Sequence, residues 1–92
     1  MSKESEVQKE IIDYLEKGGH YVIKTVRSNA RGVPDLIICT LDSGKFYAIE
    51  VKAKGKKFNT SKLQKLHLNM INKTGGKAFV ADSLWDVIEE GL

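Results

Sequence analysis

The stretch GVPDLIICTLDSGKFYAIEVKAKGKK, residues 32–57, decides the fold of this chain. Two runs rich in β-branched and aromatic residues, 35–40 and 46–52, lie on either side of a segment whose Asp, Ser and Gly are typical of a hairpin connection. We therefore predict two antiparallel strands joined by a short turn. Charged side chains stand at the ends of both strands, where burial penalises charge: Asp35, Glu50 and Lys52.

The segments outside the hairpin predict helices and further strands. Residues 4–17 have the spacing of an amphipathic helix, which Ser2 or Ser5 would cap, and residues 20–26 predict a strand. A second helix begins near Thr60 or Ser61 and ends at Gly75-Gly76, and a strand over 77–81 and a short final helix follow. The residues expected to face the core are Val7, Ile11, Tyr14, Leu15, Tyr47, Leu63, Leu66, Met70, Ile71 and Trp85.

The order α-β-β-β-α-β-α predicts an α/β fold in which helices flank a central mixed sheet, with the last strand parallel to its neighbour. At 92 residues, we expect one domain over residues 1–92. The N-terminal 19 residues contain no uninterrupted apolar run, so we predict neither a signal peptide nor a membrane span. The lone Cys39 cannot form an internal disulfide and is expected to be buried, which favours the cytoplasm.

The register of the hairpin decides whether the three charged groups meet. Alternate residues of a strand share a face, so Glu50 and Lys52 are neighbours. A two-residue connection, 43–44, places Asp35 opposite Lys52, and a four-residue connection, 41–44, places it opposite Glu50. Either register puts all three on one face, whereas an odd loop or a bulge would separate them.

Two carboxylates that converge on one point are oxygen ligands for Mg²⁺ or Mn²⁺. With a lysine beside them they suit phosphodiester hydrolysis, because metal and ammonium both stabilise charge on a phosphoryl group. The alternative is structural: Asp35 ends a loop, Glu50 pairs with Lys52, and nothing is catalysed.

The segments ESEVQKEIIDYLEKGGH, RGVPDLII, FYAIEVKAKGKK and TSKLQ, in this order, resemble the VRR-NUC family of the PD-(D/E)xK nuclease superfamily, to which archaeal Holliday-junction resolvases are related. The resemblance implies a restriction-endonuclease-like α-β-β-β-α-β core and activity on DNA as a homodimer, without an organic cofactor. It assigns Asp35, Glu50 and Val51 to the metal site and Lys52 to catalysis. It also places Gln64 beside the site and assigns a further acidic group to Glu6, for which Glu10 is the alternative one turn away.

Basic residues crowd around this hairpin, although the net charge is only +3. They are candidates for phosphate contact, or for an ordinary solvated surface: Lys24, Arg27, Arg31, Lys54, Lys56 and Lys57. The resulting hypothesis is a metal-dependent DNA endonuclease, for which cutting of branched DNA is an option. The rivals are an RNA-directed nuclease and a non-catalytic nucleic-acid-binding module on the same fold.

Overall fold

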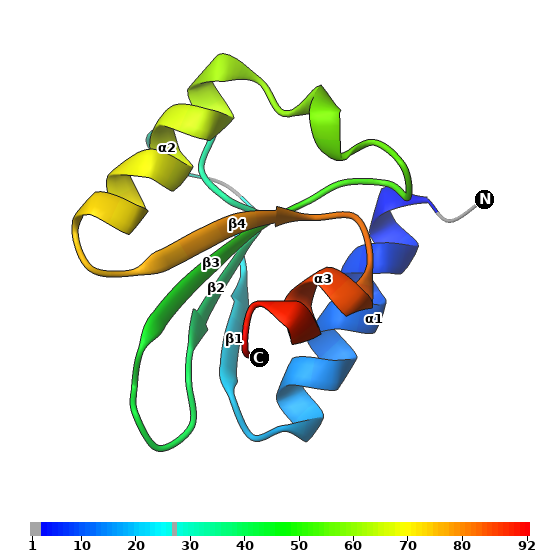
Figure 1. Ribbon diagram of the computed structural model, residues 1–92, viewed down its shortest axis with the longest axis vertical. Helices are drawn as coiled ribbons and strands as arrows, with labels where there is room; N and C mark the ends of the chain where they lie inside the picture. Colours follow the sequence, from blue (N-terminus) through cyan, green and yellow to red (C-terminus); the bar gives the residue numbers. More distant parts are fainter. Residues whose placement is uncertain (1–2, 27) are drawn as a thin grey trace.

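The hairpin predicted from residues 32–57 forms the centre of a four-stranded sheet (Figure 1). The computed structural model describes residues 3–26 and 28–92. Its elements, in order, are α1 (Glu4–Lys17), β1 (Tyr21–Lys24), β2 (Leu36–Cys39), β3 (Phe46–Val51), the 3-10 helix η1 (Lys57–Asn59), α2 (Lys62–Lys73), β4 (Lys77–Ala81) and α3 (Leu84–Glu89).

The sheet has the order β1-β2-β3-β4. β1 and β2 are antiparallel, as are β2 and β3, whereas β3 and β4 are parallel and α2 forms the crossover between them. The mixed α/β sheet flanked by helices is therefore confirmed. Strand ends differ from the predicted ones by one or two residues, because ladder pairing stops before the loops leave the sheet.

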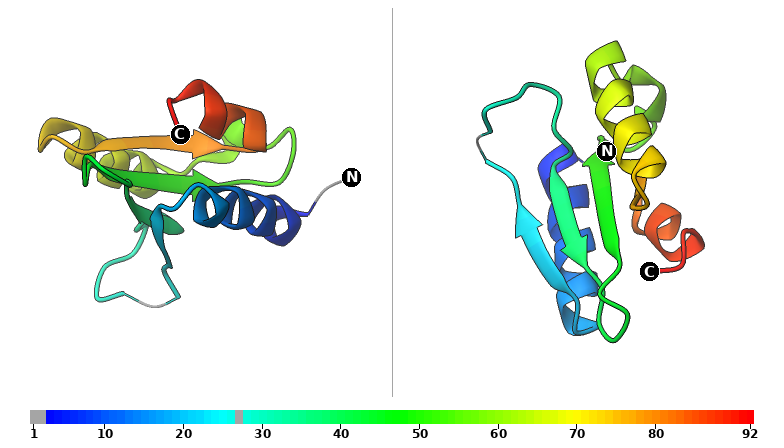
Figure 2. Two further views of the ribbon diagram at one scale, coloured as in Figure 1. Left: turned by 90° about the horizontal axis from the view of Figure 1, so that it is seen from below. Right: turned by 90° about the vertical axis from the view of Figure 1, so that its left-hand side faces the viewer.

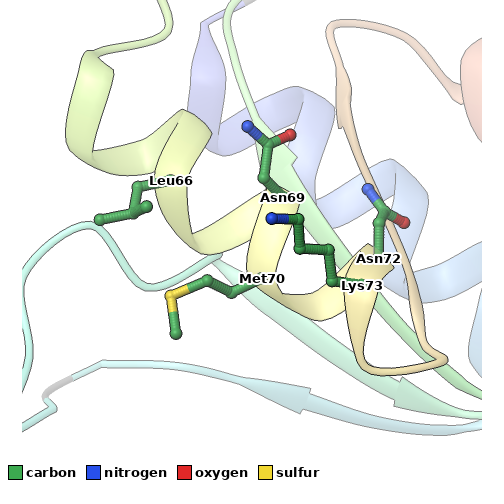
Figure 3. Close-up of a pocket in the computed structure, with 5 residues that line it drawn as sticks. All are labelled: Leu66, Asn69, Met70, Asn72 and Lys73. Atoms are coloured by element: carbon green, nitrogen blue, oxygen red, sulfur yellow. The ribbon is translucent and has the colours of Figure 1, made fainter.

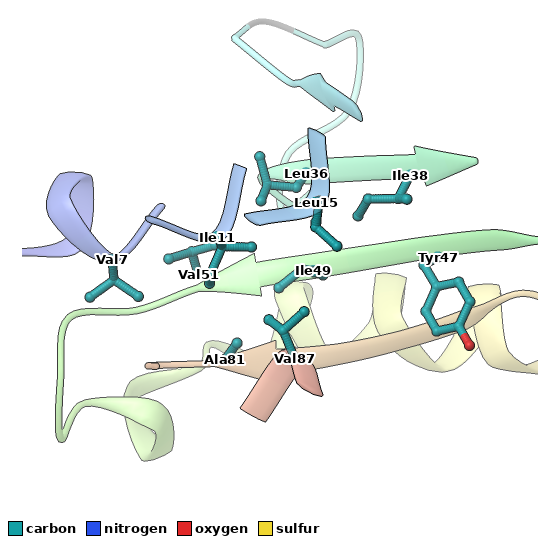
Figure 4. Close-up of a cluster of buried hydrophobic side chains, with 10 residues drawn as sticks. All are labelled: Val7, Ile11, Leu15, Leu36, Ile38, Tyr47, Ile49, Val51, Ala81 and Val87. Carbon is teal, nitrogen blue, oxygen red and sulfur yellow. The ribbon is translucent and has the colours of Figure 1, made fainter. Parts of the chain in front are cut away.

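Helices cover both faces of the sheet (Figures 1 and 2). α1 and α3 pack on one face, where Ile11, Leu15 and Val87 meet Ile49 and Val51 in the main core (Figure 4). α2 packs on the other face through Leu68, against Ala48 and Ala78. β3 is consequently buried on both sides, which explains its nearly continuous apolar sequence. No helix within the described ranges is long and apolar enough to cross a membrane.

The prediction for the inner face of α2 was wrong. Leu63, Leu66 and Met70 are 41–55% exposed, while Leu68 is buried and Ile71 is partly buried. Both sets have helical spacing, so periodicity alone does not choose between them. The small residues Ala48 and Ala78 give α2 room to approach through Leu68.

Three smaller predictions were also wrong. Trp85 is 63% exposed on α3, and Cys39 is exposed at the end of β2. The residue that caps α1 is Lys3, not Ser5, and the other candidate, Ser2, lies outside the described residues. Tyr47 is buried as expected.

Candidate active site

The hairpin adopts the second of the two registers considered above. Leu36 pairs with Ile49, which places Asp35 opposite Glu50, and the connection consists of residues 41–44. Ile37 and Ala48, the next pair on the same face, both belong to the small core under α2. Asp35 and Glu50 therefore share the face of the sheet that α2 covers.

Asp35 is fixed on both sides by hydrogen bonds. Its Oδ2 accepts a hydrogen bond from the backbone N–H of Val51 at 2.8 Å. The backbone carbonyl of Asp35 accepts from the N–H of Thr25 at 2.8 Å and from its Oγ1 at 3.0 Å. The same hydroxyl lies 2.7 Å from the carbonyl oxygen of Pro34. The end of β1 thus holds the Pro34-Asp35 peptide in place, a role for Thr25 that was not expected from the sequence.

Glu50 is an acid in an unfavourable place for its charge. Only 4% of the residue is exposed. Burial raises the pKa of Glu50 to about 8, and the negative charge of Asp35 and a hydrogen bond with its carboxyl add to this, while Lys52 acts in the opposite direction. A pair of adjacent carboxylates in this environment requires a proton or a cation, so the donor set fits a hard divalent metal ion.

Lys52 and Gln64 complete the cluster. Lys52 Nζ donates to Gln64 Oε1 at 3.0 Å and lies 3.6 Å from Glu50 Oε2. Gln64 Nε2 in turn donates to the same Glu50 oxygen at 3.1 Å. The three side chains form a closed triangle between the end of β3 and the first turn of α2. Asp35 joins it through its influence on Glu50.

Gln64 owes its position to the start of α2. Ser61 caps this helix, with its Oγ accepting from the N–H of Gln64 at 3.1 Å, and Gln64 Oε1 accepts from the N–H of Ser61 at 2.9 Å. This capping box satisfies two amides that the helix leaves open. The side-chain oxygen of Gln64 therefore serves both the helix start and Lys52.

Gly32 brings the loop before Asp35 against the same helix turn. Its φ is +80°, a region that residues with a Cβ rarely occupy. A Cβ at this position would lie 2.8 Å from the Leu63 side chain and 3.1 Å from the Leu63 backbone. Gly32 thus permits both the tight loop and the close approach to α2. Beside Asp35, a polar hollow of about 190 Å³ opens toward solvent between Thr25, Ser28 and Val33.

Neither of the two candidates for a further acidic group lies on the buried face of α1. Glu6 is exposed about 140° around α1 from the buried Ile11, and its Oε1 accepts from the N–H of Lys3 at 2.8 Å. Glu10 is exposed too. Glu4 is exposed as well, but it lies within about 20° of Ile11 on the helix wheel, and its charge makes a small contribution to the raised pKa of Glu50. Counting seven residues back from Ile11 would have identified Glu4 from the sequence.

Of the three residues assigned to the metal site from the sequence, two have side chains that could bind a metal ion. In residues 3–26 and 28–92, no three His, Cys, Asp or Glu side chains lie close enough to hold a metal ion together. Val51 can contribute only its main-chain carbonyl, because its side chain has no donor atom and is buried in the core (Figure 4). Asp35 and Glu50 are thus the side chains that could hold a metal here.

The basic residues differ in their surroundings. Lys54 and Lys56 are exposed on the loop that leaves β3 directly after Lys52. Lys57 Nζ instead bonds to Asp86 Oδ1 at 2.9 Å, which ties the loop to α3 and raises the pKa of Lys57. Arg31 is exposed in the turn before Gly32.

Two further candidates contribute less to the site. Lys24 pairs with Leu36, so its side chain starts on the α1 face, away from the carboxylates. Arg27 lies outside the described residues.

A hollow along α2, lined by Leu66, Asn69, Met70, Asn72 and Lys73, contains none of the candidate site residues (Figure 3). Leu66 and Met70 point to one side of the helix in Figure 3, and the two asparagines point to the other. The lining offers no carboxylate, so the candidate site remains the Asp35–Glu50–Lys52–Gln64 cluster.

Comparison with known proteins gives a consistent result. The model of the VRR-NUC domain matches residues 2–85. A solved structure described as a VRR_NUC domain superposes with a TM-score of 0.79 at 28% identity, covering 97% of this chain and 94% of that one. No curated protein sequence matches significantly. The chain therefore belongs to the VRR-NUC family of nuclease-type domains.

Proposed function

We propose that this chain is a Mg²⁺- or Mn²⁺-dependent endonuclease that hydrolyses DNA phosphodiester bonds in the cytoplasm. The observation that carries the proposal is that the register of β2 and β3 places Asp35 opposite the buried Glu50, where Gln64 bonds to both Glu50 and Lys52. Membership of a nuclease-type family supports it independently. A purely structural ion pair would need one carboxylate beside Lys52, not two.

Each side chain has a task in this proposal. Asp35 and Glu50 would hold the metal ion, which when bound polarises a phosphoryl oxygen and lowers the pKa of a water molecule. Lys52 has three N–H donors, of which one is bonded to Gln64 and a second faces Glu50. The third remains for a phosphate oxygen, where negative charge grows in the transition state. Gln64 orients both Lys52 and Glu50.

The test is cleavage by the Asp35→Ala variant. It should lower the single-turnover rate at least about 100-fold, and it should leave DNA binding intact or improved, because a charge that repels phosphate is removed. Asp13→Ala is the matched control, since Asp13 is an exposed carboxylate paired with Lys9 on α1. A rate near that of the unmodified protein, with the metal requirement retained, would show that Asp35 is not a metal-binding residue of the site. Faster cleavage of an RNA of the same sequence would overturn the assignment to DNA.

We also propose that two copies associate, since one site cuts one strand per engagement. Five large apolar side chains remain 41–66% exposed on the side of the sheet that α2 covers only in part: Tyr21, Ile23, Leu63, Leu66 and Met70. Together they expose on the order of 400 Å² of apolar surface, as large as patches that mark interaction sites. Light scattering should give the mass of a dimer, and Met70→Glu should shift it to a monomer. A monomer mass at all concentrations, with and without DNA, contradicts this association.

A further inference from the structure

One large aromatic side chain stands apart from the core and close in sequence to the candidate site. Phe58 is 78% exposed at the middle of η1. It lies in the connection between Lys52, at the end of β3, and Gln64, in the first turn of α2. Because Lys52 and Gln64 are hydrogen-bonded at 3.0 Å, this connection is a loop closed at its base by the site itself. In Figure 1 the loop arches over the end of the sheet where β3 and β4 finish.

The loop is anchored on both sides of Phe58. The N–H of Gly55 donates to Asp82 Oδ2 at 3.0 Å, and Lys57 Nζ bonds to Asp86 at 2.9 Å. Burial acts to raise the pKa of Asp86, but the hydrogen bonds from Lys57 and Asp82 and the charge of Lys57 together hold that pKa below the usual range, so the pair is charged. After the ring, Thr60 is buried and its Oγ1 donates to the carbonyl of Lys57 at 2.8 Å. The backbone that carries the phenyl ring is therefore held in place while the ring itself faces solvent.

The charged side chains on the connection itself are all lysines, and the acidic residues beside it, Asp82 and Asp86, hold the loop through Gly55 and Lys57. Lys54, Lys56 and Lys62 are exposed on the same connection, and no side-chain hydrogen bond or ion pair within the described ranges engages their ammonium groups. An aromatic face among lysines is the pattern of single-strand binding, in which the cations contact the backbone phosphates and the ring stacks on a base. Every base has such a face, so this contact selects an unpaired base and not a sequence.

The length of the connection limits how far the Phe58 ring can lie from Lys52 at the candidate site. Phe58 is the sixth residue after Lys52, so the Cα atoms of the two residues are at most about 20 Å apart. At about 3.4 Å for each nucleotide step along one strand of a duplex, the ring reaches at most about six nucleotides from the phosphate at Lys52. A stacked base in a fully paired duplex offers no free face, whereas a fork, flap or junction does.

We propose that Phe58 is a stacking residue for an unpaired nucleobase within about six nucleotides of the scissile phosphate, so that this domain prefers nucleic acid in which a duplex opens into single strands. This inference rests on the proposed nuclease function and names the structural class of its substrate. Lys54 and Lys56 hold the flanking phosphates, and the anchored loop lets the ring stack without a large loss of backbone freedom.

Binding tests the inference separately from cleavage. Affinities are measured by fluorescence anisotropy in EDTA for a fully paired duplex and for a fork of the same sequence, as DNA and as RNA. The unmodified protein should bind the fork more tightly, and Phe58→Ala should weaken fork binding about 5- to 100-fold while changing duplex binding less than twofold. Phe58→Tyr should retain the preference, and Phe58→Leu, which keeps apolar bulk without an aromatic face, should lose most of it. Leu41→Ala is the matched control, because Leu41 is 52% exposed in the 41–44 connection, at the end of the hairpin away from Asp35, and should leave the preference unchanged.

An abasic nucleotide provides the decisive comparison. The abasic nucleotide is placed in turn at each unpaired position of the fork. At one of these positions it should lower the affinity of the unmodified protein for the fork as much as Phe58→Ala does. At that same position it should not lower the affinity of the Phe58→Ala variant any further. Equal fork preference for the unmodified protein and Phe58→Ala, or additive losses at every abasic position, overturns the stacking role even if cleavage is normal. Loss of fork preference in Phe58→Ala without cleavage of any substrate would uphold the stacking role and overturn the proposed nuclease. Phe58→Ala should lower the affinity for DNA forks and for RNA forks equally, since the ring contacts the base. A loss of affinity for only one of the two nucleic acids would refute that contact.

Discussion

Replacing Glu50 by glutamine removes a charge that the fold opposes while it retains an oxygen that Gln64 can reach. The pKa of Glu50 rises from 4.5 to about 8 on folding, chiefly because the group is buried. At 1.36 kcal/mol per pKa unit, keeping Glu50 ionised without a bound cation costs at most about 5 kcal/mol of folding free energy. The value of about 8 already includes the opposing effect of Lys52, and water that enters the site relieves part of the remaining cost, so we expect about 2–3 kcal/mol.

Proton binding determines whether the free energy of unfolding rises or falls with pH. The folded protein holds the Glu50 proton more tightly than the unfolded chain, so the stability from this group is complete below pH 4.5 and is lost as pH rises through about 8. In EDTA, Glu50→Gln should therefore match the unmodified protein near pH 5 and exceed its free energy of unfolding by about 2–3 kcal/mol at pH 9. The difference between the two proteins isolates this group from others that titrate in the same range.

Urea denaturation between pH 5 and 9 measures this difference, with Glu16→Gln, an exposed position on α1, as the control that should show none. Mg²⁺ at pH 9 should stabilise the unmodified protein and have a smaller effect on Glu50→Gln. If the difference between Glu50→Gln and the unmodified protein does not change with pH, burial does not raise the pKa of Glu50 and our reasoning about the carboxylate pair fails.

Four further predictions concern the residues around this pair. Lys52→Ala should lower the single-turnover cleavage rate more than DNA affinity, whereas Lys54→Ala should do the reverse; equal effects would make Lys52 another phosphate contact. Changing Lys54 and Lys56 together to Ala should flatten the dependence of log affinity on log salt by up to about 2 units, because Lys57 is already paired with Asp86, and an unchanged slope would assign both lysines to solvent. Gln64→Leu should lower cleavage and also the melting temperature, since it removes a cap and a site contact at once; a change in only one of the two would separate these roles. Gly32→Ala should destabilise the protein by about 1–3 kcal/mol through its positive φ and the clash with α2, and thermal unfolding indistinguishable from the unmodified protein would contradict this.

The hairpin was predictable because local chemistry specifies it. For a connection with an even number of residues, the LDSGK turn and the alternating faces gave two registers, and both brought Asp35, Glu50 and Lys52 to one face; the structure has the four-residue connection, without the odd loop or bulge that would have separated them. The facing of α2 was not predictable, because 63/66/70 and 64/68/71 are equally regular helical stripes. Contacts distant in sequence decide between them: the small Ala48 and Ala78 on the sheet, and Lys52 bonded to Gln64.

Other residues were missed because their partners come from another part of the chain. Thr25 is an ordinary strand residue until β1 lies beside Asp35. The resemblance assigned the further acidic group to Glu6, whereas position around the helix, which was not considered, places Glu4 nearest to the buried face of α1. Trp85 was expected inside by its size alone, but α3 is too short to bury more than one face, and Val87 occupies it.

Gln64 both caps α2 and bonds to Lys52 and Glu50, so local opening of the helix end also disturbs the candidate active site. The first turn of α2 is an end of a helix, and helix ends open more readily than the whole protein unfolds. Each time this turn opens, Gln64 leaves Ser61, and Lys52 and Glu50 lose their common partner in the same event. Inactivation on warming should then begin several degrees below the global melting temperature. Hydrogen exchange at the Gln64 amide would report the same opening.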